Sequence, residues 1–389
     1  MEDNPRVDSK AEILPVPPSD GGGELRSVIV QACHEAGGWL PFDRFMALAL
    51  YTPGLGYYAN GLVKFGALPL SGSDFVTAPE LSPWFGRTLG RQVGQALQAT
   101  GTDEVWEFGA GSGALAEQVL TQLQADGVPW RRYTIVDLSG VLRQRQQQRL
   151  AAWGDRVQWA SALPGRLEGV VLGNEVLDAM PVQLLKRSGG VWYERGVAIR
   201  PATHGRPEEL VWADRPTPLR PPADVPGAHD YLTEIHPQAE AFIRTLADHW
   251  RRGAAFFIDY GFPETEYYHP QRHMGTLMCH RLHRSDADPL ADVGLKDITA
   301  HVNFTGVALA AQEAGLQVMG YTSQGRFLLN AGLLELAAQA PMAERAGLAR
   351  LVHEHEMGEL FKVLALAPMA SAEGWLPMGF ARGDRTHTL

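Results

Sequence analysis

Short apolar runs alternate with segments of helical period through most of the chain, and this pattern predicts an α/β fold. The runs expected to be strands are, in order, residues 105–108, 133–137, 157–160, 169–172, 254–260, 316–321 and 361–366. Between them, apolar residues recur every three or four positions, which favours helices, for example over 140–153, 237–250 and 302–314. Because buried parallel strands are near-continuous apolar runs, we expect a mostly parallel sheet covered by helices on both faces.

Several parts of the chain depart from this alternation and suggest a domain organisation. Residues 1–24 are polar, rich in proline and end in three glycines, so we expect a flexible leader. Residues 25–100 are mostly of helical period and are expected to form a helical cap. The core would be 101–389, with a β-rich insertion at about 181–235 and a segment rich in His, Tyr and Asp at about 261–300. The sheet needs neither insertion, so both are candidates for a substrate or dimer surface.

The composition narrows the class of partner. The chain has 389 residues, a net charge of −10 and a pI near 5.7, which disfavours binding to nucleic acid or to an anionic membrane. It has 2 cysteines, so a disulfide framework is excluded and a reducing compartment is expected. No apolar run approaches the roughly 20 residues that span a bilayer, and the first residues are acidic rather than rich in arginine. These features predict a cytoplasmic protein.

The stretch EVWEFGAGSGALAEQVL, residues 104–120, is typical of a strand, a glycine turn and a helix that together bind a nucleotide. Its glycine spacing fits a dinucleotide site only weakly; an NAD-dependent oxidoreductase is one alternative, and a tight turn that binds nothing is another. Glu107 favours a different ligand, because a carboxylate before the loop would repel a pyrophosphate but suit the ammonium and sulfonium of S-adenosylmethionine. Asp137, at the end of the next strand, would then accept hydrogen bonds from the ribose hydroxyls.

The end of the fourth expected strand adds two acids and an amide. Asn174, Glu175 and Asp178 lie there, and ligands of open α/β sheets bind beyond the carboxyl ends of the strands. We therefore expect these side chains to face the methyl donor, with helix capping by Asn174 or Asp178 as the alternative. The residues expected to bind the cofactor are Glu107, Gly109, Ala110, Gly111, Ser112, Gly113, Asp137, Leu138, Ser139 and Asn174.

A histidine-rich segment has spacings that could be interpreted as metal ligation. Its members are His269, His273, Cys279, His280 and His283. The segment lacks a second cysteine pair and a His-Glu-x-x-His pattern, and methyl transfer from a sulfonium needs no metal. We expect a structural or substrate-facing loop here, and no metal site.

Six motifs together resemble the MidA family of class I S-adenosylmethionine-dependent methyltransferases. They are VWEFGAGSGALA, YTIVDLSGVLRQRQ, GNEVLDAMPV, DYGFPETEYYHPQR, GTLMCHRLHRSDADPL and DITAHVNF, and the resemblance covers about residues 25–366. It implies a Rossmann-like sheet of seven strands with the last strand antiparallel. It also implies protein arginine methylation, which mitochondrial members perform on a subunit of respiratory complex I. Asp137 departs mildly from the pattern, since many methyltransferases have Glu there, but either carboxylate can bind the ribose.

The acids after the fourth strand have a chemical role if arginine is the acceptor. A guanidinium is always protonated near neutral pH and is a weak nucleophile, so a nearby carboxylate would orient it and help to remove its proton. Glu175 is the first candidate for that role and Asp178 the second, while Thr77, Pro79 and Glu80 would line the substrate pocket. The expected partner is a protein, with a respiratory-complex subunit as one candidate, and a homodimer is one candidate for the assembly state. The alternative to catalysis is an assembly factor that binds S-adenosylmethionine without turnover.

Overall fold

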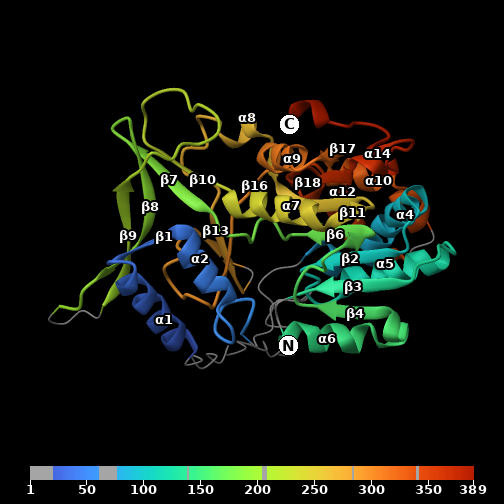
Figure 1. The fold of residues 1–389 in the computed structure, drawn as a ribbon, viewed down its shortest axis with the longest axis horizontal. Helices are drawn as coiled ribbons and strands as arrows, with labels where there is room; N and C mark the ends of the chain where they lie inside the picture. Colours follow the sequence, from blue (N-terminus) through green and yellow to red (C-terminus); the bar gives the residue numbers. More distant parts are fainter. Residues whose placement is uncertain (1–20, 61–76, 138–139, 204–207, 283, 339–340) are drawn as a thin grey trace, which may run out of the picture.

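A mixed sheet lies at the centre of the computed structural model, which describes residues 21–60, 77–137, 140–203, 208–282, 284–338 and 341–389 (Figure 1). Seven strands follow one another in the order β4–β3–β2–β6–β12–β18–β17. They are β2 (Glu104–Phe108), β3 (Arg132–Val136), β4 (Val157–Ala160), β6 (Val170–Asn174), β12 (Ala255–Phe262), β17 (Leu316–Ser323) and β18 (Phe361–Pro368). β2, β3, β4, β6 and β12 are parallel, whereas β18 is antiparallel to both β12 and β17. The α/β class and the antiparallel last strand are as expected, and β16 (Val302–Asn303) adds a short strand beside β12.

Helices cover both faces of this sheet, because successive residues of a strand point to opposite sides. On β2, Val105 packs in one apolar core with α4 (Pro83–Thr100) and α5 (Ala114–Ala125). Its neighbour Trp106 packs in another core with α7 (Pro237–His249) and α9 (Phe304–Glu313). Further helices are α6 (Gly140–Arg149), α8 (Glu264–Tyr267), α10 (Gln324–Asn330), α11 (Leu333–Ala337), α12 (Met342–Val352), α13 (Met357–Leu360), α14 (Met369–Ala372) and the short 3₁₀ turns η2 (Ala151–Arg156), η3 (Met378–Phe380) and η4 (Thr386–Thr388).

A second, antiparallel sheet stands beside the core (Figure 1) and contains most of the expected insertion at 181–235. Its strands are β1 (Trp39–Pro41), β7 (Gln183–Ser188), β8 (Val191–Arg200), β9 (Glu209–Pro216) and β10 (Tyr231–Ile235). α1 (Gly21–Glu35) and α2 (Phe42–Tyr51) pack against it around a separate apolar cluster that includes Ile29, Phe45 and Val197. The alternating pattern of this insertion therefore does form strands.

The helical cap expected over 25–100 is divided between two places in the structure. β1 pairs with β8, so the first part of the region belongs to the antiparallel sheet. α4 instead packs along α5 and covers the central sheet. The spacing of apolar residues shows which face of a helix is buried, but it does not show which element covers that face. Here one part of the region packs on the antiparallel sheet and the other part on the central sheet. The expected leader lies outside the described residues apart from 21–24, which begin α1.

The segment at 261–300 forms a small sheet of its own. β13 (Met278–Arg281) pairs with both β14 (Arg284–Asp286) and β15 (Asp297–Thr299). Elsewhere, β5 (Leu167–Glu168) pairs with β11 (Trp250–Arg252). Within the described ranges, no helix combines the length and the apolar character that a bilayer span requires.

The contact between α4 and α5 depends on glycines that repeat every four residues along α4. A Cβ added at Gly86 would lie 2.6 Å from the Cβ of Gln118, and one added at Gly90 would lie 2.8 Å from the Cβ of Gln122. Gln118 also accepts a hydrogen bond from the Gly86 N–H at 3.0 Å and donates one to the Pro79 carbonyl at 2.8 Å. The close approach of the two helices therefore also fixes the chain at Pro79.

We expect Gly86→Ala to destabilise the protein even though alanine favours helix formation. Overpacking typically costs about 1–3 kcal/mol, which exceeds the roughly 1 kcal/mol gained in helix propensity. Gly23→Ala is a matched control, because an added Cβ there meets nothing within 4 Å. Urea denaturation should show a lower midpoint for Gly86→Ala and an unchanged or higher one for Gly23→Ala. Equal stabilisation of both variants would contradict the close contact.

Candidate active site

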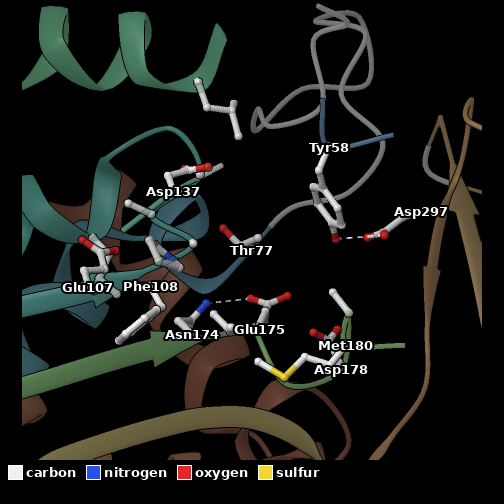
Figure 2. Close-up of a pocket in the computed structure, with 18 of the residues that line it drawn as sticks. Tyr58, Thr77, Glu107, Phe108, Asp137, Asn174, Glu175, Asp178, Met180 and Asp297 are labelled. Carbon is white, nitrogen blue, oxygen red and sulfur yellow. Dashed lines mark hydrogen bonds between the residues drawn. The ribbon is translucent and has the colours of Figure 1, made fainter. Parts of the chain in front are cut away.

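A cavity of about 1320 Å³ opens at the carboxyl ends of β2, β3, β6 and β12. It lies where the strand order reverses, because β3 and β4 follow on one side of β2 whereas β6 and β12 lie on its other side. Figure 2 shows side chains from several strands around this space. The sequence-predicted site residues that line it are Thr77, Pro79, Glu80, Glu107, Gly109, Ala110, Gly111, Ser112, Asp137, Asn174, Glu175 and Asp178. Leu138 and Ser139 lie outside the described residues.

The glycine loop turns through backbone conformations that other residues rarely adopt. Gly109 has a φ of 62° and Gly111 a φ of 52°, so the turn after β2 requires glycine at both positions. Gly113, expected to bind the cofactor, instead begins α5 against Gln146 and is not among the described residues that line the cavity. The backbone of 109–112 forms a cradle at the start of a helix. Such a cradle fits the amino-acid end of S-adenosylmethionine.

Glu107 is buried on β2 and also lines the cavity. The hydroxyl of Tyr133, on the neighbouring strand, donates a hydrogen bond to its carboxylate at 2.7 Å. Burial raises the pKa of Glu107 to about 8, Asp137 adds to this shift, and the Tyr133 hydrogen bond opposes it. Below that pH the site therefore favours the neutral carboxyl.

Asp137 is held towards the glycine loop by Gln146 of α6. The Gln146 amide donates hydrogen bonds to Asp137 Oδ2 at 2.8 Å and to the Gly111 carbonyl at 2.9 Å. The indole N–H of Trp159 donates to the Gln146 side-chain oxygen at 2.9 Å, which fixes the orientation of that amide. Sequence reasoning missed Gln146, because one glutamine in a Gln/Arg-rich helix carries no distinguishing signal.

The loop after β6 is held by one buried carboxylate. Asp259 Oδ2 on β12 accepts the N–H groups of Val176, Leu177 and Asp178 at 3.1, 2.9 and 3.2 Å. Glu175, at the start of this loop, has a φ of 54°, which non-glycine residues seldom adopt. Strained residues of this kind often occur at functional sites. Asp259 therefore fixes the backbone that presents the predicted catalytic acids.

The alternative that Asn174 or Asp178 caps a helix is wrong. β6 is followed by a turn and then by β7, and no helix begins in this described stretch. Asn174 instead donates a hydrogen bond from Nδ2 to Glu175 Oε1 at 3.0 Å (Figure 2). Its side chain therefore contacts the neighbouring acid at the cavity.

The acids of this loop are held at raised pKa values. Burial raises the pKa of Glu175 to about 8, and Asp178 adds to the shift. Burial raises the pKa of Asp178 to about 6, against a hydrogen bond from Tyr260. Among the described residues, no Lys or Arg nitrogen lies within ion-pair distance of Glu175, Asp178 or Asp259. These acids therefore lack a cation from the described part of the protein.

α3 (Ala78–Leu81) brings Pro79 and Glu80 to the cavity, where Glu80 contacts the glycine loop. Glu80 accepts a hydrogen bond from the Ser112 hydroxyl and pairs with Arg149 of α6 at 3.3 Å. Arg149 also donates to Ser112 Oγ at 2.6 Å. Arg149 thus joins α3, the loop and α6, a role that no sequence motif indicated.

The histidine-rich segment does not assemble into a metal site in the described part of the chain. His269 and His273 are exposed, Cys279 is buried, and His280 lines the cavity. His283 lies outside the described residues. No group of three or more described His, Cys, Asp or Glu side chains is arranged to hold a metal ion.

The profile of the family described as "Putative S-adenosyl-L-methionine-dependent methyltransferase" matches residues 88–322. The chain belongs to this family. A COG1565 superfamily structure from Burkholderia thailandensis, bound to S-adenosyl-homocysteine, is 49% identical with a TM-score of 0.90, over 97% of this chain and 100% of that one. The mitochondrial protein arginine methyltransferase NDUFAF7 homolog of Drosophila melanogaster is 29% identical over 414 residues, which cover 94% of this chain and 88% of the relative. NDUFAF7 of Homo sapiens is 26% identical over 85% of this chain and 80% of its own length.

Family membership confirms the resemblance to MidA methyltransferases, the activity class and S-adenosylmethionine as the cofactor. It decides against the NAD-dependent oxidoreductase. The expectation of a cytoplasmic protein is contradicted, because the NDUFAF7 relatives are named as mitochondrial. That expectation rested mainly on the absence of a membrane-spanning run and of an arginine-rich N-terminal segment. The absence of such a signal does not identify the compartment of a protein.

We expect Glu107→Gln to stabilise the methyltransferase increasingly as the pH rises. Unfolded Glu ionises near pH 4.5, whereas folded Glu107 has a pKa of about 8, so the folded state retains a proton that the unfolded chain has lost. The free energy of unfolding of the wild type should therefore fall as the pH rises between these values, and this contribution is absent in the variant. Glutamine also keeps an oxygen that can accept from Tyr133.

Urea titrations of the cofactor-free protein from pH 5 to pH 9 measure this difference. Glu24→Gln, at an exposed position in the first turn of α1, is the control, and its stability should differ from that of the wild type by the same small amount at every pH. A stability difference for Glu107→Gln that did not grow with pH would show that Glu107 is not held neutral by burial.

Proposed function

We propose that this methyltransferase transfers a methyl group to an arginine side chain of a partner protein. The observation that carries the proposal is a buried group of oxygen acceptors at the cavity. Asn174 Oδ1 and Asp178 Oδ1 are both buried without a donor among the described residues, and Glu175 lies between them in sequence. A guanidinium offers five N–H donors and a positive charge, which matches such a set. The names of the mitochondrial relatives support the same acceptor.

The glycine loop and the acids around it would hold the cofactor. The backbone of 109–112 would receive its amino-acid end, with Glu107 facing the ammonium group. Asp137, oriented by Gln146, would accept hydrogen bonds from the ribose hydroxyls, and Asn174 would lie near the methyl group. When bound, S-adenosylmethionine supplies a methyl group on a positively charged sulfur. The positions of these residues around the cavity support the assignments.

Glu175 would be the principal catalytic residue and Asp178 the second. Their carboxylates would accept N–H groups of the guanidinium and so localise its charge on the nitrogens that do not react. The attacking nitrogen forms its bond to the methyl carbon as the bond from carbon to sulfur breaks, with the electron pair left on sulfur. Glu175 would then receive the proton that the methylated nitrogen loses. Pro79 and Glu80 of α3, together with Thr77 directly before this helix, would border the acceptor.

The partner protein and the assembly state stay predictions. A respiratory-complex subunit as substrate and a homodimer are both compatible with the proposal. The alternative, an assembly factor that binds S-adenosylmethionine without turnover, would not methylate any protein. Wild-type protein incubated with labelled S-adenosylmethionine and a lysate should give methylarginine peptides by mass spectrometry, whereas tight cofactor binding without labelled protein would favour the assembly factor.

We expect Glu175→Gln to bind S-adenosyl-homocysteine within about threefold of the wild type by calorimetry. Its methyl transfer should fall by roughly a hundredfold or more, because glutamine can neither take the proton nor offset the guanidinium charge. Glu266→Gln, at an exposed position, is the control and should keep both properties. Unchanged turnover in Glu175→Gln would remove Glu175 from the mechanism.

The pH dependence of methyl transfer should follow the ionisation of Glu175. Its pKa is about 8, so kcat/KM should rise with pH and reach half its maximum near that value. The negative charge of Asp178 contributes to this raised pKa. In Asp178→Asn the midpoint should therefore shift to lower pH, even if the rate also falls. A profile that is flat from pH 6 to pH 9 in the wild type would contradict the role of Glu175.

A further inference from the structure

The acids after β6 face a second group of polar side chains that comes from outside the central sheet. Tyr58 follows α2 and Asp297 begins β15, and both line the cavity. The Tyr58 hydroxyl donates a hydrogen bond to Asp297 Oδ1 at 2.8 Å. Figure 2 shows this pair across the open space from Glu175 and Asp178. We call Glu175 and Asp178 the first wall, and Tyr58 and Asp297 the second wall.

The second wall is fixed in place by its neighbours. Asp297 Oδ1 also accepts the N–H of Ile298 at 2.9 Å, which limits rotation of the carboxylate. The ring of Tyr51 stacks on Tyr58 with centroids 5.6 Å apart and an angle of 21° between the planes. The Tyr51 hydroxyl donates to the Ala179 carbonyl at 2.8 Å, directly after the first wall. Tyr51 therefore ties the two walls together and holds their separation.

The two walls act on one another electrostatically. Asp297 is only 2% exposed. Burial is the main cause of the raised pKa of Glu175, and the charges of Asp178 and Asp297 both add to it. Asp178, in the first wall, is 4% exposed and its Oδ1 has no donor among the described residues. A cationic donor placed between the walls would relieve both the repulsion and the missing hydrogen bond.

We propose that Tyr58 and Asp297 select the side chain that accepts the methyl group, by holding the edge of a guanidinium that the first wall leaves free. The inference rests on the arginine methylation proposed above. A guanidinium is flat, with donors along several edges, so it can donate to both walls and stack on a tyrosine ring. A lysine ammonium concentrates three donors at one point and cannot serve both walls in this way. The second wall therefore discriminates arginine from lysine, and it belongs to segments added to the core.

The test uses the full chain saturated with S-adenosyl-homocysteine. The probes are N-acetyl-arginine amide and N-acetyl-lysine amide, titrated by saturation-transfer NMR. The wild type should bind the arginine probe about tenfold more tightly than the lysine probe. Asp297→Asn preserves the size of the side chain and removes its charge, so the arginine affinity should fall roughly tenfold while the lysine affinity changes less than about threefold. Tyr58→Phe keeps the ring and should give a smaller loss in the same direction.

Asp292→Asn is the matched control. Asp292 is exposed and pairs with Arg281, and its φ of 51° is one that asparagine also adopts readily. It should leave the affinity for both probes unchanged. S-adenosyl-homocysteine affinity should be preserved in Asp297→Asn and Tyr58→Phe. Tyr58→Phe should lower the unfolding temperature, because the buried Asp297 carboxylate loses a donor, but both variants should be folded at the assay temperature.

The outcomes separate this inference from the proposed function. Wild-type preference for the arginine probe that persists in Asp297→Asn and Tyr58→Phe would overturn the selective role of the second wall and leave arginine methylation standing. Equal loss of both probes would show a merely structural role and would also overturn it. A wild type that binds neither probe, or prefers lysine, would overturn arginine methylation and this inference with it.

Discussion

The arrangement of the active site depends on the buried carboxylate of Asp259. β12 is parallel to β6 with Ile258 opposite Asn174, so Asp259 reaches the first residues beyond the end of β6. Three backbone N–H groups would each cost about 1–3 kcal/mol if they were buried without partners, and one carboxylate oxygen accepts all of them. This contact lets the loop turn tightly enough that Glu175 takes a positive φ. Burial, and then the charges of Asp178 and Glu175, raise the pKa of Asp259 well above its usual range. The buried Asp259 carboxyl is thus part of both the geometry of the loop and the raised pKa values of the site.

The cavity combines two structural units with different tasks. The central sheet supplies the glycine loop, Asp137 and the acids after β6, which are the groups expected to serve the cofactor and the chemistry. Tyr58 and Asp297 come from segments that accompany the antiparallel sheet and the small sheet around β13. In the proposed arrangement, segments outside the central sheet select the acceptor while the central sheet holds the methyl donor, so the two tasks belong to different structural units.

Charge links these units. Both expected ligands are cations, whereas Glu107, Glu175 and Asp178 have pKa values raised mainly by burial. Burying these acids without a ligand reduces the stability of the folded state above the pH at which they would ionise in the unfolded chain. A bound cation would offset this loss of stability. The burial that destabilises the ligand-free protein therefore favours the binding of its ligands.

The sequence by itself determined the parallel core, the glycine turn and the acids at the strand ends. Each is a local feature, and the carboxyl ends of parallel strands necessarily meet at one edge, so Glu107, Asp137 and Glu175 could be brought together without coordinates. Only the tertiary structure decided that β1 joins the antiparallel sheet, that Asp259 holds a loop about 80 residues away in sequence, and that Tyr58 meets Asp297 across 239 positions. Periodicity reports which face of an element is buried. Which distant element covers that face depends on packing and on the pairing of buried polar groups. Neither can be predicted from a single segment of the sequence.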